Sequence, residues 1–157
     1  MSGIRAAVVT VSDGVSQGTR ADGSGDAAEA LLREAGFDVE ARTLVPDERP
    51  AIETALRELA DSGGFALVVT TGGTGFGPRD VTPEATRAVI QREAPGLAEA
   101  MRLVNPLGRL SRARAGSIGA CLVLNTPGST SGALECLGAV ADVLPHALAL
   151  LAGAHPH

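Results

Sequence analysis

Apolar stretches alternate with polar, turn-forming stretches along the chain, and their periods predict strands and helices in turn. Residues 4–11 form an apolar, β-branched run, which predicts a buried strand that ends in a polar loop. Apolar residues at helical spacing over 27–35 predict a helix that stops at Gly36. The pattern then repeats, with a strand predicted over residues 37–45 and a helix over residues 52–60.

The third unit shows the same order most clearly. The apolar run at 65–71 predicts a strand, and a glycine-rich turn follows it. Thr82 and Pro83 then stand in the order typical of an N-cap and the first helical residue. Pro95 and Gly96 interrupt this helix, and a further amphipathic segment follows them. A strand is therefore expected to lead into a helix through a glycine-rich loop.

The last part of the chain completes the alternation. Residues 119–124 predict another buried strand, and a helical region follows from about Gly132, with Pro145 restarting or kinking it. Strands that alternate with helices favour a mostly parallel sheet covered on both faces. We therefore expect an α/β fold, a three-layer α/β/α domain over residues 1–153, with a mobile tail at residues 154–157.

In a sheet of this kind, the loops at the carboxyl ends of the strands meet at one edge, where ligands bind. Four polar loops follow predicted strands in this chain, with the sequences SDG, VPDE, GGTGFGPRD and NTPGS. Their expected convergence predicts a functional site at this edge.

Composition narrows the chemistry that this site can carry. All 13 basic residues are arginine, so the absence of lysine excludes a P-loop and Schiff-base catalysis. A net charge of −5, with three Phe and no Trp or Tyr, argues against nucleic-acid binding. Cys121 and Cys136 lack metal-ligand spacing and are expected to be reduced core residues. With no apolar run long enough for a membrane and no signal-peptide pattern, a cytoplasmic protein is expected.

The glycine-rich loop has the composition of an anion-binding nest. Gly72, Gly73, Gly75 and Gly77 allow main-chain N–H groups to approach a ligand without obstruction by a β-carbon. The helix that follows adds the partial positive charge of its N-terminus, and Arg79 can contact phosphate through two N–H groups. The loop therefore predicts a site for a phosphate-bearing ligand.

Two carboxylates accompany this nest. Asp80 would repel bound phosphate unless a divalent cation such as Mg²⁺ bridged the two groups. Asp47 follows the preceding strand and would form the second carboxylate for metal binding or proton transfer. Spacing alone leaves two interpretations of Asp47 open, because it would equally well cap the helix that follows it.

Two other interpretations of the glycine-rich loop fit less well. The spacing G-x-G-x-G at 73–77 and the length of the loop do not match the dinucleotide-binding motif. Glycines that merely turn the chain are also common, but a loop so rich in glycine, with Arg and Asp beside it, is unusual for a simple turn.

Several ordered motifs together resemble the molybdopterin adenylyltransferase family of Mog and MoaB type. The motifs are VTVSDG near the start, LVPDE at 44–48, TTGGTGFGPRDVTPEAT at 70–86, REAPGL at 92–97, LSRARAG at 110–116 and NTPGS at 125–129. The resemblance covers nearly the whole chain. It implies Mg²⁺-dependent transfer of AMP from ATP to the phosphate of molybdopterin, with release of pyrophosphate. It also implies a homotrimer, in some members paired as a hexamer, and a molybdenum-insertion protein as a downstream partner.

The resemblance also implies roles for individual residues. The aspartates that match the family's catalytic pair are Asp47 and Asp80, which would also hold Mg²⁺. The positions expected to bind nucleotide or phosphate are Ser12, Asp13, Asp22, Gly72, Gly73, Thr74, Gly75, Arg79 and Thr82. Those expected on the pterin side are Ser111, Arg112, Pro127 and Gly128. A non-catalytic carrier of molybdopterin is the alternative function. Asn105 and Pro106 depart from the family pattern, since a number of relatives carry a serine near this helix end.

Overall fold

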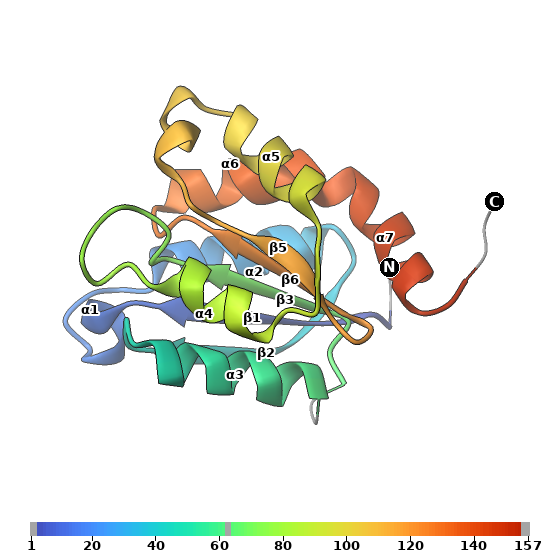
Figure 1. Ribbon diagram of the computed structural model, residues 1–157, viewed down its shortest axis with the longest axis horizontal. Helices are drawn as coiled ribbons and strands as arrows, with labels where there is room; N and C mark the ends of the chain where they lie inside the picture. The colour runs from blue at the N-terminus through green and yellow to red at the C-terminus, as the bar shows by residue number, and fades with distance from the viewer. Residues whose placement is uncertain (1–2, 62–63, 155–157) are drawn as a thin grey trace.

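A six-stranded sheet lies between two layers of helices in the computed structural model, which describes residues 3–61 and 64–154 (Figure 1). The strand order is β2-β1-β3-β6-β5-β4. The four parallel strands are β1 (Arg5–Val11), β2 (Asp38–Val45), β3 (Leu67–Thr71) and β6 (Cys121–Thr126). Two strands with antiparallel pairing complete the sheet, β5 (Ala115–Ile118) and β4 (Arg92–Glu93). The predicted three-layer α/β/α fold with a mostly parallel sheet is confirmed.

The helices cover both faces of this sheet (Figure 1). One face packs against α2 (Gly23–Glu34), α5 (Pro95–Leu103), α6 (Thr130–Val140) and α7 (Leu144–Leu151). The other face packs against α3 (Arg49–Asp61) and α4 (Thr82–Val89). Short turns of helix lie at α1 (Asp13–Ser16), η1 (Pro106–Leu110) and η2 (Ala141–Val143).

The alternation of side chains along each strand divides the core in two. Val8 and Val69 belong to the cluster beneath α2 and α6, whereas their neighbours Val9 and Val68 belong to the cluster beneath α3 and α4. Because the parallel strands are buried on both faces, they appear in the sequence as continuous apolar runs. The sheet is thus a rigid support for the loops at its edge.

The observed helix ends agree with the predicted ones in most places and differ at one. Gly36 follows the C-cap of α2 with a φ of 95°, and α7 begins one residue before Pro145, as expected. Thr82, however, is not the N-cap of α4, because the helix begins at Thr82 and Val81 occupies the cap position without a side-chain bond. The Thr82 hydroxyl instead donates to the Gly72 carbonyl at 2.9 Å, since this buried side chain faces the glycine-rich loop.

The two antiparallel strands and α1 were not predicted. The sequence of β5, AGSI, carries little β-branched bulk, and β4 is only two residues long. Pairing with β6 and burial of small side chains, rather than local propensity, make these segments strands. Of the predicted mobile tail, residues 155–157 lie outside the described residues.

One segment among the described residues, Thr130–Leu151, is long and apolar enough in composition to suit a membrane span. It comprises α6, η2 and α7. Leu137, Leu144 and Leu148 of this segment are buried in the core against the sheet. Core packing thus accounts for part of its apolar character, and Leu134, Val143 and Leu150 of the segment remain exposed.

Candidate functional site

The strands end in a buried polar row at their carboxyl ends. Thr71 of β3 pairs with Thr10 of β1 and with Thr126 of β6, and Thr70 pairs with Asn125. All five residues are buried. Buried polar side chains are costly unless they are hydrogen-bonded. The hydrogen bonds of these five residues extend across neighbouring elements. The row therefore fixes the edge of the sheet where the loops meet.

Asn125 is the central member of this row. Its side-chain amide donates at 3.0 Å to both the Thr70 and the Thr86 hydroxyls, and its side-chain oxygen accepts from the Arg114 backbone N–H at 3.0 Å. A single amide thus joins β3, β6, α4 and the segment before β5. The available signal in the sequence was a polar residue directly after an apolar strand run.

The glycine-rich loop begins with a backbone conformation that requires glycine. Gly72 and Gly73 have φ values of 96° and 71°. A β-carbon on Gly72 would lie 2.2 Å from the Val11 carbonyl oxygen, and one on Gly73 would lie 2.3 Å from the Thr82 hydroxyl oxygen. The chain therefore passes close to β1 and α4 in a way that no side chain permits.

The next part of the loop presents unpaired backbone donors. The N–H groups of Gly73, Thr74 and Gly75 donate to no residue within the described parts of the chain. By contrast, the Gly72 N–H bonds the Thr126 carbonyl, and the Gly77 N–H bonds the Asp80 carboxylate at 2.9 Å. Of the predicted nest, the amides of Gly73 and Gly75 thus stay free of bonds to described residues, and together with the Thr74 amide they are suited to an anion.

Arg112 forms hydrogen bonds with the backbone of this loop. Its guanidinium donates at 2.7 Å to the carbonyl oxygens of Gly75 and of Asp80, and it forms an ion pair with Glu84 at the start of α4. The hydrogen bond from Arg112 lowers the pKa of the Glu84 carboxyl below its ordinary value. Arg112, predicted on the pterin side, lines neither of the two pockets described below and acts through the loop backbone.

Asp13 and Asp47 bind each other's backbone across two loops. The Asp13 N–H donates to the Asp47 carboxylate at 3.0 Å, and the Asp47 N–H donates to the Asp13 carboxylate at 2.9 Å. Arg79 donates twice to the Asp13 carboxylate, at 2.9 and 3.0 Å. Asp47 makes no bond to the start of α3, so the interpretation of Asp47 as a helix cap is not supported. Asp13, in turn, holds the side chain of Arg79.

The pKa values of the two carboxylates in this pair are shifted in opposite directions. Hydrogen bonds from Arg79 and from the Asp47 backbone lower the pKa of Asp13. Burial raises the pKa of Asp47, and the nearby charges of Asp13 and Asp80 raise it further, against the effect of its backbone bond. Asp47 is therefore a carboxylate whose charge its surroundings disfavour, as is common at functional sites.

The surroundings of Asp47 and Asp80 fit a hard cation. Each carboxylate uses one oxygen for a backbone N–H, and its other oxygen bonds no described residue. No group of three or more His, Cys, Asp or Glu side chains in the described parts of the chain is arranged to hold a metal. Mg²⁺ commonly binds one or two carboxylates and completes its shell with water and substrate phosphate. This donor set suits such a shared site.

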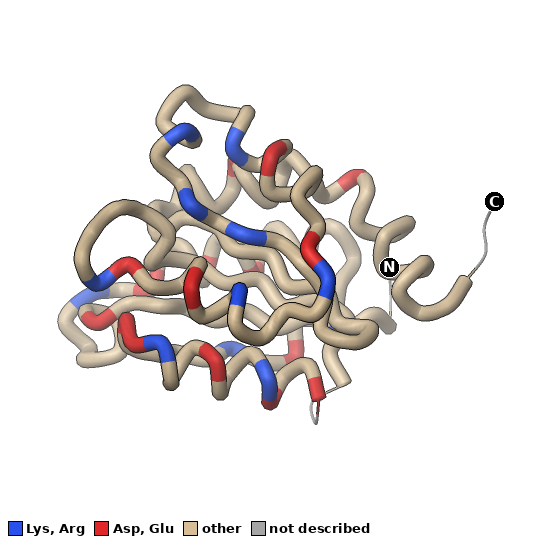
Figure 2. The backbone as a smooth tube through the Cα atoms, viewed as in Figure 1, with Lys and Arg blue, Asp and Glu red and all other residues tan. Residues whose placement is uncertain are grey.

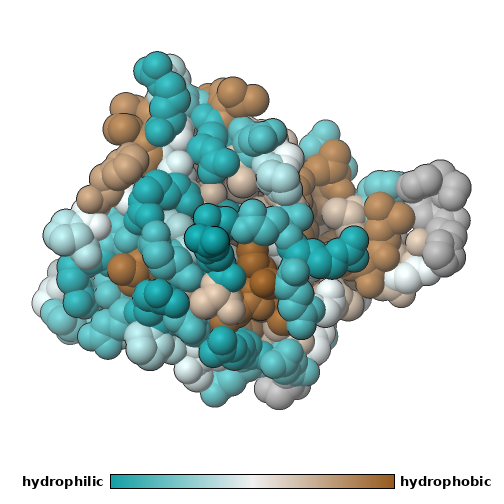
Figure 3. Space-filling view, in the orientation of Figure 1, coloured by the Kyte–Doolittle hydropathy of each residue, from teal (hydrophilic) through white to brown (hydrophobic). Residues whose placement is uncertain are grey.

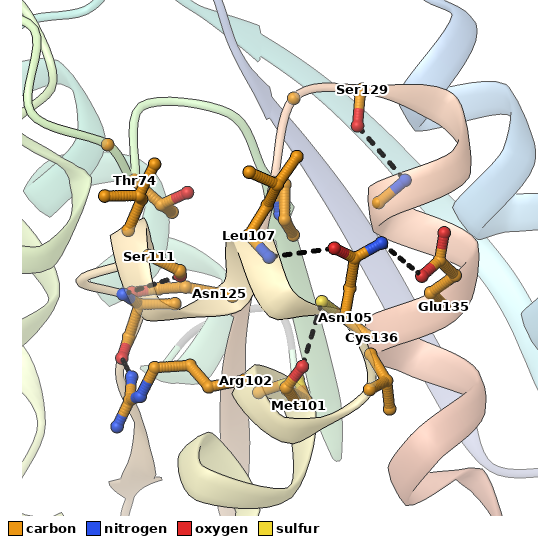
Figure 4. Close-up of a pocket in the computed structure, with 18 of the residues that line it drawn as sticks. Thr74, Met101, Arg102, Asn105, Leu107, Ser111, Asn125, Ser129, Glu135 and Cys136 are labelled. Atoms are coloured by element: carbon orange, nitrogen blue, oxygen red, sulfur yellow. Dashed lines mark hydrogen bonds between the residues drawn. The ribbon is translucent and has the colours of Figure 1, made fainter.

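Two pockets open at this edge and share a boundary. The larger, of about 510 Å³, lies between the glycine-rich loop, α5, η1 and α6 (Figure 4). The smaller, of about 440 Å³, lies between the ends of β1 and β3 and the start of α2. Both are lined by Gly73, Asp80, Gly128 and Ser129. We call these four residues the junction.

The predicted residues divide between the two pockets. The smaller pocket is lined by Ser12, Asp22, Asp47, Gly72, Gly73, Asp80 and Gly128. The larger is lined by Gly73, Thr74, Gly75, Asp80, Ser111, Pro127 and Gly128. Ser12 and Asp22 also cap α1 and α2, and Asp22 forms an ion pair with Arg42. Asp13, Arg79 and Thr82 line neither pocket and instead support the loops around them.

Several lining residues were not identified from the sequence. Arg20 lines the smaller pocket, and its side chain forms no ion pair or hydrogen bond with any residue in the described ranges. Asn105, Glu135 and Cys136 line the larger pocket, the last two from α6 well beyond its N-cap Ser129 (Figure 4). Arg20 lacked any motif signal, and Glu135 was hidden in the regular pattern of a helix.

Comparison with known proteins agrees with this geometry. The sequence profile described as "Probable molybdopterin binding domain" matches residues 7–146. A molybdopterin adenylyltransferase of Helicobacter pylori (strain J99 / ATCC 700824) is 40% identical over 98% of this chain and 90% of its own length. The molybdenum cofactor synthesis protein cinnamon of Drosophila melanogaster is 38% identical over 96% of this chain, which spans only 26% of that protein.

A solved structure shares the fold closely. The molybdopterin biosynthesis enzyme MoaB of Thermus thermophilus superposes with a TM-score of 0.92 at 50% identity, over 96% of this chain and 98% of that one. The profile match spans most of the chain, and the relatives align along nearly all of it. The chain therefore belongs to the molybdopterin-binding domain family of molybdenum cofactor biosynthesis proteins.

Proposed function

We propose that this protein is an adenylyltransferase that transfers AMP from ATP to the phosphate of molybdopterin and releases pyrophosphate. The observation that carries the proposal is the meeting of two pockets at Asp80 and the glycine-rich loop. A group transfer between two substrates needs two binding sites that bring the reacting groups of the substrates together. The names of the curated relatives, molybdopterin adenylyltransferases, support the same reaction.

The smaller pocket suits the nucleotide. Polar groups line it, among them the caps of two helices at Ser12 and Asp22. Arg20 supplies a cation without a partner among the described residues, which suits a phosphate chain. The larger pocket suits the pterin, because the apolar side chains of Met101 and Leu107 offer walls for a flat ring.

At the junction, an oxygen of the pterin's phosphate would attack the α-phosphorus of ATP. A new P–O bond forms as the bond between the α-phosphorus and the bridging oxygen breaks, and pyrophosphate leaves with that electron pair. The free amides of Gly73, Thr74 and Gly75 would stabilise the charge that develops on phosphate oxygens. Bound Mg²⁺ would neutralise phosphate charge, held by the free oxygens of Asp47 and Asp80. No covalent protein intermediate is required.

The test is AMP transfer by purified protein. Wild-type protein with molybdopterin, ATP and Mg²⁺ should form adenylylated pterin and pyrophosphate in equal amounts. Asp80→Asn should reduce turnover by at least about 100-fold, because one metal-binding oxygen is lost. The asparagine oxygen can still accept the Gly77 N–H, so the melting temperature should change little. Asp142→Asn, at an exposed position outside both pockets, is the charge-matched control. Near-normal turnover of Asp80→Asn would remove its assigned role.

A non-catalytic molybdopterin carrier is the alternative, and the larger pocket by itself would suffice for it. Calorimetry separates the two functions. Binding of molybdopterin without any binding of Mg²⁺-ATP would favour the carrier, whereas binding of both supports the enzyme. The polar smaller pocket and its Arg20, which has no partner among the described residues, favour the enzyme.

The proposal extends to assembly. Leu103, Leu107 and Leu110 expose 84, 72 and 56% of their surfaces, and Figure 3 shows apolar atoms gathered over α5 and η1. Exposed apolar patches commonly mark protein contacts, which supports self-association; we propose a homotrimer, or a hexamer formed from two trimers. Along the backbone, basic and acidic positions are interspersed in the view of Figure 2. We place the protein in the cytoplasm, with a molybdenum-insertion protein as the recipient of its product.

A further inference from the structure

The larger pocket carries a carboxylate far from the junction. Glu135 of α6 and Asp80 are the two acidic residues that line this pocket among the described parts of the chain. Asp80 belongs to the junction, whereas Glu135 lies six residues beyond Ser129 along α6. At 1.5 Å per helical residue, the two ends are separated by about 9 Å along the helix axis. A ligand whose phosphate lies at the junction would therefore bring its opposite end to Glu135.

Asn105 holds this carboxylate in a defined place. Its side-chain oxygen accepts from the Leu107 N–H at 2.9 Å, which orients the amide (Figure 4). Its side-chain nitrogen then donates to one oxygen of Glu135 at 3.2 Å. The other oxygen of Glu135 bonds no described residue, and no arginine pairs with the group within the described ranges. Glu135 thus retains acceptor capacity beside the pocket.

The walls between the two ends are mostly apolar. Met101, Val104 and Leu107 come from α5 and the segment after it, and Cys136 and Pro127 add to these apolar walls. Arg102 also lines the pocket and donates to the Ala113 carbonyl at 2.7 Å. Met101 is almost fully buried, whereas Leu107 exposes most of its surface. An apolar slot with a carboxylate at one end and a phosphate site at the other fits a flat, nitrogen-rich ring that carries a phosphate.

We propose that Glu135 selects the pterin through its aminopyrimidine edge, with Asn105 as a positioning residue; this inference rests on the proposed function. A pterin presents its 2-amino N–H and its ring N3–H side by side, and both are donors. An ionised carboxylate is an acceptor only and can receive both bonds in a paired geometry. A lumazine carries a carbonyl in place of the amino group and would turn an oxygen toward the carboxylate. Such a pocket rejects the lumazine because the acceptors face each other.

The experiment measures binding rather than turnover. Calorimetry would compare a pterin with a 6-phosphomethyl group and the lumazine that carries the same group, each with wild-type protein. We expect wild-type protein to prefer the pterin by at least about tenfold, the loss typical of a missing charge-assisted bond. Glu135→Gln should reduce this preference by at least about fivefold, because a glutamine offers one uncharged acceptor and adds donors that suit the lumazine carbonyl.

Matched variants keep the outcome interpretable. Glu99→Gln removes the same charge from an exposed position on α5 outside the pocket and should leave the preference unchanged. Asn105→Ala should weaken pterin binding less than Glu135→Gln does, since it releases the carboxylate without removing it. Retention of the full preference in folded Glu135→Gln would overturn the inference and leave the proposed function intact. Failure of wild-type protein to bind the pterin would overturn both.

Discussion

The conformation of Gly72 leads to a prediction that separates two sources of strain. Gly72→Ala places a side chain in the left-handed region, at a φ of 96°. The new β-carbon would also lie 2.2 Å from the backbone oxygen of Val11, a contact that no side-chain rotation relieves. The first effect costs about 1–2 kcal/mol, and overpacking against fixed backbone adds about 1–3 kcal/mol.

We therefore expect Gly72→Ala to lower the free energy of unfolding by about 2–5 kcal/mol, a large part of the roughly 5–15 kcal/mol typical of a folded protein. Gly18→Ala provides the matched control, because Gly18 also has a positive φ, 77°, but no atom lies within 4 Å of its notional β-carbon. That variant should lose only the backbone contribution, about 1–2 kcal/mol.

Urea denaturation of both variants and the wild type measures these differences. A Gly72→Ala loss larger than that of Gly18→Ala by about 1–3 kcal/mol supports the close approach to β1. Equal losses in the two variants would refute it, because the contact with Val11 would then contribute nothing. Since Gly72 precedes the junction residue Gly73, Gly72→Ala should also weaken Mg²⁺-ATP binding, whereas Gly18→Ala should not.

Two further predictions concern the smaller pocket. Burial raises the pKa of Asp47, so its ionisation opposes folding: the stability it contributes is present at acid pH and is lost as the pH rises through its folded-state pKa. Asp47→Asn should therefore raise the melting temperature at about pH 7 in metal-free buffer, with the gain shrinking toward about pH 3, and a gain that grows on acidification would contradict this. Arg20→Gln should raise the KM for ATP by about tenfold with little change in the KM for pterin, as expected for one lost phosphate contact. Arg87→Gln is its charge-matched control in the same steady-state assay, and an unchanged KM for ATP in Arg20→Gln would exclude the contact.

The sequence predicted the elements that local patterns determine. Apolar runs identified the four parallel strands, and the position of Gly36 identified a helix end, because each pattern reflects burial or backbone conformation of its own residues. Convergence of the loops followed from the parallel topology alone. The pairing of strands is not determined by such local patterns, which is why β4 and β5 were not predicted.

Side-chain roles within the site were harder to predict, because they depend on neighbours distant in the sequence. Arg79 has the right residue type and loop for a phosphate contact, yet Asp13, which lies 66 residues away, holds it. Arg112 was expected beside the pterin, yet it bonds two carbonyl groups of the glycine-rich loop. Both arginines bond to other residues of the site, whereas Arg20, without a partner among the described residues, lines the smaller pocket, where we propose that it contacts phosphate.

The internal bonds of the loops also indicate the chemistry of the ligand that the junction accepts. Each of Asp47 and Asp80 keeps one oxygen free of hydrogen bonds to described residues, and these free oxygens can bind a cation. The three consecutive amides of Gly73 to Gly75 have no acceptor among those residues, which calls for an anion. Neither a bare cation nor a bare phosphate satisfies both sets at once, because each would leave one set uncompensated. A phosphate that arrives with its own divalent cation satisfies both, and for this reason we propose Mg²⁺-ATP, rather than either component by itself, as the ligand of these groups.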